Sequence, residues 1–323
     1  MLPSDWASAD APNELVAVGS PRDSEIRSRF ELLGPSSAFD SVFKIADENG
    51  ATHLFWERQY IDSDYRDEFS NFYASTCPPH QDRCERIHFL TQEAKDLPTS
   101  NLGYVTIRPI SRRPVSRTVV SPPNELDEFV SCKATSTTYP VGKKFQVDGF
   151  PFLGQDTQYG VCAHAAIWMI CHYHHLANRH GRRYMSDIVK SAGAVQTENR
   201  LLPSQGLTVP QIARAFQELK LPAVHYDLQS LPNDEAPETI ACRYLNSRLP
   251  VLLATKHPEL GGHATVLVGY RSLPDGSLGF IRQNDANAPY ELAKPEEDYC
   301  GEWLSMMVPM PGKIYMSGET AEA

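Results

Sequence analysis

Long apolar runs are missing from this sequence, and their absence bears on where the chain works. No apolar stretch reaches the roughly 20 residues that a membrane-spanning helix requires. The opening segment, MLPSDWASADAPNELVAVG, also lacks the basic patch and apolar core of a secretory signal. We therefore expect a cytoplasmic protein with no membrane partner.

Basic residues are also few. The 323 residues include 30 Lys and Arg against 40 Asp and Glu, which gives a formal net charge of -10. A chain with this balance offers no basic stripe that could neutralise phosphates. We therefore do not expect it to bind nucleic acid.

Cysteine is too scattered for a disulfide framework. The chain has 7 cysteines, an odd number, and they are spread over its length. Small secreted proteins instead carry an even set of closely spaced cysteines. We expect reduced thiols in this protein, at Cys77, Cys84, Cys132, Cys162, Cys171, Cys242 and Cys300.

Apolar residues make up 41% of the chain, enough for one large core or two smaller ones. Residues 1–35 are polar and rich in Pro, Ser and Asp, so we expect a flexible arm. Residues 36–135 contain strand-like HLFWERQYI and GYVTIRPI around an amphipathic helix, DSDYRDEFSNFYAS, and we expect an N-terminal α/β region of unknown role. Prolines and glycines around residue 135 indicate a seam, and residues 136–323 form the second expected domain.

The second domain reads as helices followed by strands, which predicts an α+β fold. One helix is expected from Cys162 to about Ala177, and another begins near Thr208, an N-cap residue with Pro210 in the first turn. The segments LPAVHYD, LPVLLAT, HATVLVGYR and LGFIRQND are rich in strand-forming residues. The last two are joined by SLPDGS, which predicts a hairpin turning at Asp275 and Gly276.

Cys162 stands where a polar loop meets a buried helix, and this position suits a nucleophile. Only a thiolate attacks a carbonyl well, and a helix N-terminus or a nearby histidine lowers the pKa of a thiol. His263 is the best-placed histidine, since it opens an apolar strand directly after two glycines. The predicted hairpin brings Asn284 and Asp285 near His263, where either could orient the ring.

Acyl transfer also needs a donor for the developing oxyanion. A backbone N–H at the nucleophile usually acts together with a side-chain amide just upstream. Gln155 and Gln158 both qualify.

The segment QDTQYGVCAHAA, followed by GGHATVLVGY and then FIRQND, resembles the papain-like cysteine peptidases, especially the bacterial branch related to bacteriocin-leader-processing peptidases. The resemblance implies a central helix that bears the nucleophile and packs on an antiparallel sheet, here with an N-terminal α/β extension. It implies Gln155 as oxyanion donor, Cys162 as nucleophile, His263 as general base and acid, and Asp285 as the residue that orients the ring. It implies no cofactor.

Side chains alternate across a strand, so only one of Asn284 and Asp285 is expected to face His263. We expect Asp285, which shares its face with Ile281 and Gln283 and resembles the aspartate ending of the bacterial branch. Its replacement by alanine is accordingly expected to lower turnover more than replacement of Asn284.

Two histidine-containing segments raise the possibility of a metal. The run HYHH at residues 172–175 lacks further ligands at metal-site spacing, and we interpret it as a solvated helix face. The run CPPHQDRCERIH contains Cys77, His80, Cys84 and His88, but their order matches no common zinc finger, which favours a packed loop. We expect no metal.

The resemblance implies hydrolysis of a peptide or isopeptide bond in a protein or peptide substrate, through a thioester. Two alternatives use the same residues. The acyl group could pass to an amine, as in an acyltransferase or a transglutaminase-like enzyme, or the fold could be a catalytically silent papain-like binding module. Intact Gln, Cys, His and Asp positions argue against the silent module.

Overall fold

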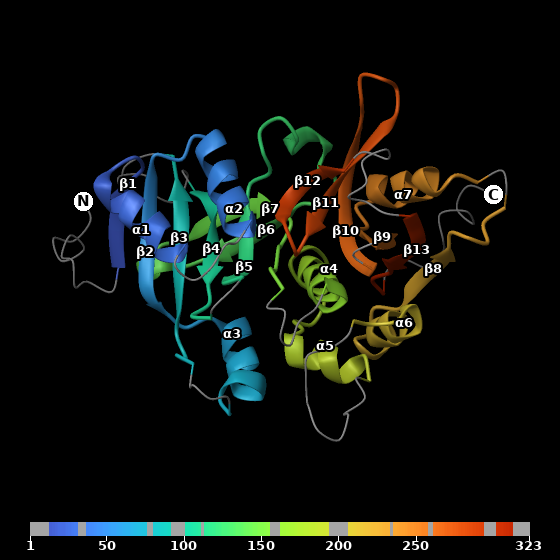
Figure 1. Cartoon of the computed structure of the whole chain (residues 1–323), viewed down its shortest axis with the longest axis horizontal. Coiled ribbons are helices and arrows are strands. Elements are labelled where there is room, and N and C mark those ends of the chain that lie inside the picture. Colours follow the sequence, from blue (N-terminus) through green and yellow to red (C-terminus); the bar gives the residue numbers. More distant parts are fainter. Residues whose placement is uncertain are drawn as a thin grey trace. The chain divides into compact units, whose positions relative to one another are not determined.

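The computed structural model describes residues 13–31, 37–75, 80–91, 101–110, 113–155, 162–193, 206–232, 235–257, 261–293 and 302–312. The chain divides into two compact units (Figure 1). Unit 1 comprises the described parts of Met1–Glu125, Ala134–Asp156 and Ala286–Ala288, and unit 2 those of Leu126–Lys133, Thr157–Asp285 and Pro289–Ala323. Both units mix helices with antiparallel strands, in agreement with the expected α+β class. The main boundary lies near residue 156 and not at 135, because residues 134–149 pair as a hairpin that belongs to unit 1.

Unit 1 is built on a five-stranded antiparallel sheet whose strands follow chain order. This sheet consists of β1 (Asn13–Ala17), β2 (His53–Tyr60), β3 (Cys84–Leu90), β4 (Asn101–Ile107) and β5 (Val115–Val120). A separate two-stranded sheet contains β6 (Ala134–Thr138) and β7 (Phe145–Gly149). The bridge between Thr118 and Phe152 ties the chain after β7 to β5.

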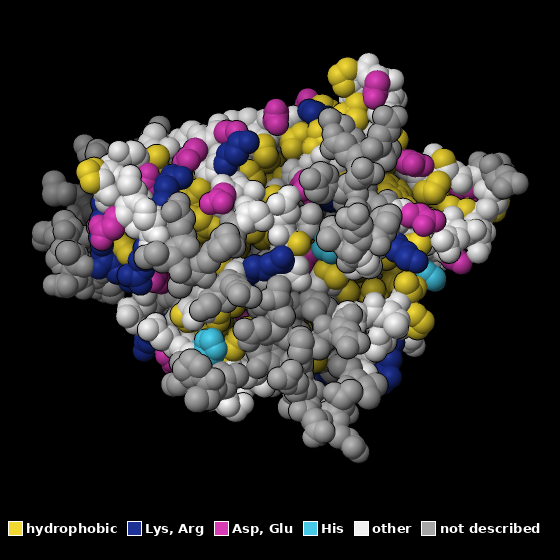
Figure 2. Space-filling model, viewed as in Figure 1, with side chains coloured by type: hydrophobic (Ala, Val, Ile, Leu, Met, Phe, Trp, Pro, Cys, Tyr) yellow, Lys and Arg dark blue, Asp and Glu magenta, His cyan; other side chains and the backbone are white. Residues whose placement is uncertain are grey.

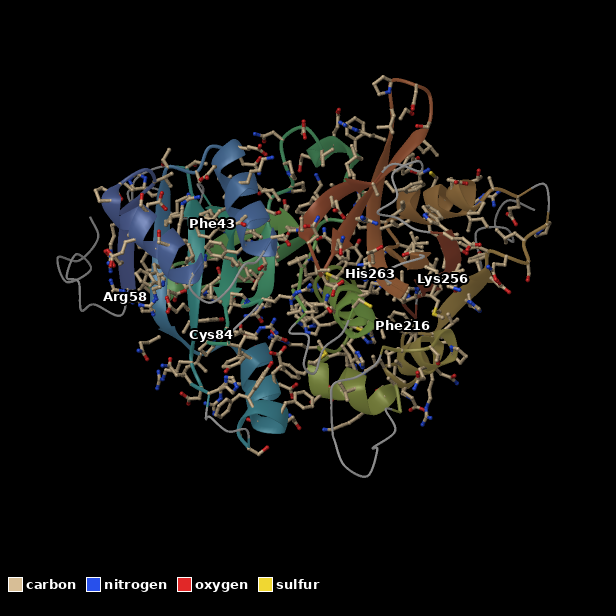
Figure 3. The ribbon with its side chains drawn as sticks, viewed as in Figure 1. Phe43, Arg58, Cys84, Phe216, Lys256 and His263 are labelled. Carbon is tan, nitrogen blue, oxygen red and sulfur yellow. The ribbon has the colours of Figure 1, made fainter. Side chains whose placement is uncertain are left out.

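The helical elements of unit 1 are α1 (Pro21–Glu31), α2 (Ser37–Glu48), α3 (Ser63–Glu68), the π-helical turn η2 (Phe69–Tyr73) and the 3-10 turn η5 (Pro140–Gly142). Four phenylalanine rings from α1, α2 and β3 pack in a row. Their centroids are 5.4 Å apart for Phe30–Phe39, 4.4 Å for Phe39–Phe43 and 5.1 Å for Phe43–Phe89. Such pairs bury a large apolar area and favour tilted or edge contacts. Phe43, which contacts both Phe39 and Phe89 in this row of rings, is labelled in Figure 3.

The expectation of a flexible arm over residues 1–35 is wrong for residues 13–31. β1 pairs with β2 from Asn13 to Ala17, and α1 buries Ile26 and Phe30. The segment is polar on average, but Ile26 and Phe30 are four residues apart, a spacing that places both on one helix face.

Unit 2 contains a six-stranded sheet with the order β12-β11-β10-β9-β13-β8. Its strands are β8 (Ala223–Asp227), β9 (Val251–His257), β10 (Gly261–Ser272), β11 (Leu278–Asn284), β12 (Ala288–Ala293) and β13 (Glu302–Pro309). The helical elements of the unit are η4 (Asp127–Phe129), α4 (Cys162–Asn178), α5 (Met185–Ser191), α6 (Val209–Glu218) and α7 (Pro237–Asn246). The four predicted strands and the hairpin of β10 and β11 are confirmed, whereas β12, β13, α5 and α7 were not predicted.

Helix α4 packs on β10 and is buried from Ala163 to His174 (Figure 1). The interpretation of residues 172–175 as a solvated face is therefore wrong, since His172 and His174 are 5% and 0% exposed. A helix with small or apolar residues all round its circumference is covered on every side. Here β9, β10, α5 and α6 all contact α4, which makes it a rigid base for its first residue, Cys162.

Among the described residues, no helix combines the length and the apolar character needed to cross a membrane. Figure 2 shows Lys and Arg side chains interspersed with Asp and Glu on the described part of one face. Charges of opposite sign also pair in the described residues, and Arg27, for example, lies 3.0 Å from the exposed Asp47. Exposed pairs of this kind contribute little to stability.

Gly269 marks a close backbone approach inside unit 2. The segment after η4 crosses β10 there, with a bridge between Val130 and Gly269 and a 3.0 Å hydrogen bond from the Cys132 N–H to the Val268 carbonyl. A Cβ atom on Gly269 would collide with the carbonyl oxygen of Phe129 and lie 2.9 Å from the Cα of Val130.

We expect Gly269→Ala to lower the free energy of unfolding by about 2 kcal/mol, because the crossing backbone must move away. Gly181→Ala is the matched control, since its added Cβ would meet nothing nearer than 4.0 Å. Urea unfolding monitored by circular dichroism measures both variants. Equal midpoints for the two variants would contradict the close approach.

Candidate active site

Cys162 is the first residue of α4 and is partly buried. Burial raises the pKa of its thiol to about 11, and the negative charge of Asp285 adds to this rise. The backbone N–H groups of Ala264, Ala163 and Cys162 act in the opposite direction. The helix N-terminus therefore does lower the pKa of the thiol, as expected, but burial and the charge of Asp285 raise that pKa by more. A thiolate at neutral pH requires a neighbouring base that takes the thiol proton.

His263 is the histidine that the strands bring to this region. It is the third residue of β10, where it pairs with Thr255 of β9, and its side chain is 27% exposed. The backbone N–H of the next residue, Ala264, lies close enough to the Cys162 sulfur to lower the pKa of its thiol. His263 therefore lies close to the start of α4, and it is labelled in Figure 3.

Asn284 makes the hydrogen bond that orients His263. Its Oδ1 lies 2.9 Å from Nε2 of the ring, whereas Oδ1 of Asp285 lies 3.9 Å from the same nitrogen. The prediction that Asp285 orients the ring directly is corrected by this geometry. Asp285 is still adjacent, and its side chain is fully buried, so its charge can stabilise a protonated imidazole.

A β-bulge explains why Asn284, and not Asp285, forms the hydrogen bond to His263. The hairpin begins with Ser272 opposite Leu278, and a regular register from there would set Asp285 opposite Thr265, on the His263 face. The pairing shifts between Leu267 and Gly269, so that Val266 lies opposite Gln283. One more step sets Asn284 opposite Thr265. β11 then ends at Asn284, so strand alternation no longer governs Asp285.

Two further side chains complete this polar cluster. Asn284 donates through Nδ2 to Oε2 of Glu291 at 2.9 Å, and Arg282 donates through Nε to the same oxygen at 2.7 Å. Neither Arg282 nor Glu291 was predicted as a site residue. No sequence signal identified Glu291, because it lies on β12, a strand that the sequence pattern did not predict.

Gln155 belongs to unit 1, where it is partly buried. The preceding residue, Gly154, accepts a 2.8 Å hydrogen bond from Arg108. Gln158 and the rest of residues 156–161 lie outside the described residues. The oxyanion role of Gln155 therefore stays a prediction.

Within the described ranges, no group of three or more His, Cys, Asp or Glu is arranged to hold a metal ion. His172 stacks on Trp168 with ring centroids 4.7 Å apart, and His175 donates to the His180 carbonyl at 2.8 Å. In the other segment, Nε2 of His88 lies 3.2 Å from Glu57, and burial lowers the pKa of His88 to about 4. Cys77 lies outside the described residues.

We expect the purified protein to carry well under one equivalent of zinc, because these histidines already have protein partners. EDTA treatment is expected to leave the melting temperature unchanged. Elemental analysis and thermal melts before and after EDTA measure the two quantities. Stoichiometric zinc with a lower melting temperature after chelation would contradict this expectation.

No protein-family model matches the sequence, and a search of curated proteins finds no match to it.

The electrostatics of Cys162 can be tested without a substrate. In a His263→Ala background the thiol has lost its predicted proton acceptor, so its alkylation is expected to follow the raised pKa of about 11. Adding Asp285→Asn removes a negative charge, which should lower that pKa and speed labelling by iodoacetamide at about pH 9. Peptide mass mapping measures the rate, with Cys242 in the same digest as the control. An unchanged or slower rate would contradict the position of Asp285 beside the thiol.

Proposed function

We propose that this protein is a papain-like cysteine peptidase that hydrolyses a peptide or isopeptide bond. The observation that carries the proposal is the bond between His263 and Asn284 beside the thiol of Cys162. A nucleophile, a base and a group that orients the base are the components of this chemistry. A buried helix that begins at the nucleophile and packs on an antiparallel sheet also supports the papain-like assignment.

The first half of the reaction forms a thioester. His263 accepts the thiol proton, and the Cys162 sulfur attacks the carbonyl carbon of the scissile amide. The Cys162 N–H stabilises the resulting oxyanion, and Gln155 is the predicted second donor. The tetrahedral intermediate collapses, His263 returns the proton to the leaving amine, and the acyl group remains on sulfur.

The second half regenerates the thiol. Water loses a proton to His263 and attacks the thioester, and the departing sulfur recovers that proton while the carboxylic acid product leaves. Asn284 keeps the ring in position through both halves. The Asp285 carboxylate favours the imidazolium that forms in each, which compensates for its unfavourable effect on the thiolate.

The buried thiol makes the transfer to His263 the central step of the proposal. With a pKa of about 11, the thiol would supply little thiolate to solvent at neutral pH. A proton moved to His263 instead creates an ion pair whose two members titrate together. The proposal includes a protein or peptide substrate, no cofactor, and a cytoplasmic location.

The test uses an epoxide or iodoacetamide probe and a mixed peptide library. Wild-type protein is expected to label at Cys162 near pH 7 and to cleave library peptides, whereas Cys162→Ala should do neither and Cys242→Ala should do both. His263→Ala should lower both rates by about 10²- to 10⁴-fold, the usual contribution of a general base. Intact-mass spectrometry and product sequencing provide the readouts.

Different products separate the alternatives. Amide-linked products formed with an added amine, without hydrolysis, would indicate an acyltransferase or transglutaminase-like enzyme. Failure of Cys162 to label faster than Cys242 would favour the catalytically silent binding module and sink the peptidase proposal.

The two strand-end residues should differ in their effects. We expect Asn284→Ala to lower kcat about 10- to 100-fold, because the ring loses its 2.9 Å hydrogen bond to the Asn284 side chain, and Asp285→Ala to lower it less. Steady-state kinetics on a cleaved library peptide compares the two variants, with circular dichroism to verify folding. A larger loss for Asp285→Ala would show that its charge matters more than the bond from Asn284.

A further inference from the structure

Glu291 lies one hydrogen bond beyond the orienting asparagine. Its Oε2 accepts from Asn284 Nδ2 at 2.9 Å and from Arg282 Nε at 2.7 Å. Arg282 and Asn284 are two residues apart on β11 and share one face of that strand, while Glu291 stands on the adjacent strand β12. The side chains of Arg282 and Glu291 are 3% and 22% exposed, so the cluster is largely shielded from water.

The chemistry of a carboxylate gives this contact a direction. An ionised carboxylate has acceptor oxygens and no hydrogen, whereas the amide of asparagine has an oxygen on one side and an NH2 group on the other. Of the two ends of the Asn284 amide, only the NH2 group can therefore form a hydrogen bond to Glu291. The amide oxygen is thereby left to face Nε2 of His263.

An amide oxygen in turn constrains the imidazole. It can only accept, so the hydrogen bond to His263 exists when Nε2 carries a proton. In the neutral ring the other nitrogen, Nδ1, is then unprotonated and able to take a proton from a thiol. If the Asn284 amide turned over, its NH2 group would face Nε2 and favour the tautomer with the proton on Nδ1, which cannot act as a base.

We propose that Glu291 is a positioning residue that sets the tautomer of His263 through Asn284. This inference rests on the proposed function, because the tautomer matters for catalysis only if His263 accepts the Cys162 proton. Arg282 supports the arrangement by binding the same oxygen of Glu291, which keeps the carboxylate at the amide.

A swap of donor and acceptor tests the inference. Asn284→Asp places a second carboxylate against Glu291 and removes the NH2 donor, so Cys162 alkylation at about pH 7 should fall about tenfold or more. Adding Glu291→Gln supplies a new NH2 donor for the introduced carboxylate, whose other oxygen can still accept from His263. The double variant should recover to within about threefold of wild type.

Glu291→Gln alone should also stay within about threefold of wild type, since its amide oxygen can still accept from Asn284 and Arg282. Glu291→Ala removes the acceptor and should lower the rate about tenfold. Arg282 would then be left buried beside an empty position, so this variant could fail to fold. The swap remains decisive in that case, because each of its variants keeps an acceptor for Arg282.

Glu235→Gln is the matched control for loss of an ion pair in the same unit. The Arg243–Glu235 pair also measures 2.7 Å, and its side chains are 25% and 24% exposed. This variant should leave the rate of Cys162 alkylation unchanged.

The ring tautomer provides a readout that does not depend on catalysis. In Cys162→Ala protein labelled with ¹⁵N-histidine, nitrogen chemical shifts should show His263 protonated on Nε2, and Glu291→Ala should introduce the other tautomer. The inference is overturned by two results together. The alkylation rate of Cys162 in the double variant falls by the product of the two single-variant losses, and the His263 tautomer is the same with and without Glu291. If instead Cys162 never labels faster than Cys242, the proposed function fails, while the tautomer still decides the role of Glu291.

Discussion

The candidate site depends on one hydrogen bond across the hairpin of β10 and β11, between His263 and Asn284. It forms only if the two strands keep the register that sets Val266 opposite Gln283. That register follows from the bulge near Val268, where the crossing backbone of residues 129–132 also meets β10. The contact that packs this segment against the strand and the irregularity that positions Asn284 therefore occur at the same place.

Burial has opposing effects on the chemistry of the site. It holds α4 rigid on the sheet and fixes the position of Cys162, but it also disfavours the thiolate. Backbone N–H groups at the helix start offset only part of that cost. A thiol in this setting gains reactivity through a neighbouring base more than through its own acidity, which makes the orientation of His263 the controlling feature.

The polar groups around His263 form a directed series and not merely a cluster. Arg282 donates to Glu291, which accepts from the Asn284 amide, whose oxygen accepts from the ring. Each member restricts how the next can be oriented, because a guanidinium only donates and a carboxylate only accepts. Networks of this kind hold one arrangement when every member is satisfied.

The sequence by itself determined the start of α4 at Cys162, the helix after Thr208, the turn at Asp275 and the nearness of His263 to the end of β11. These features follow from local patterns of capping, turn residues and alternation, which need no knowledge of distant neighbours. Tertiary structure decided the rest. The bulge in β10 selected Asn284 over Asp285, and β12 supplied Glu291, because both depend on strands that pair only after the chain has folded.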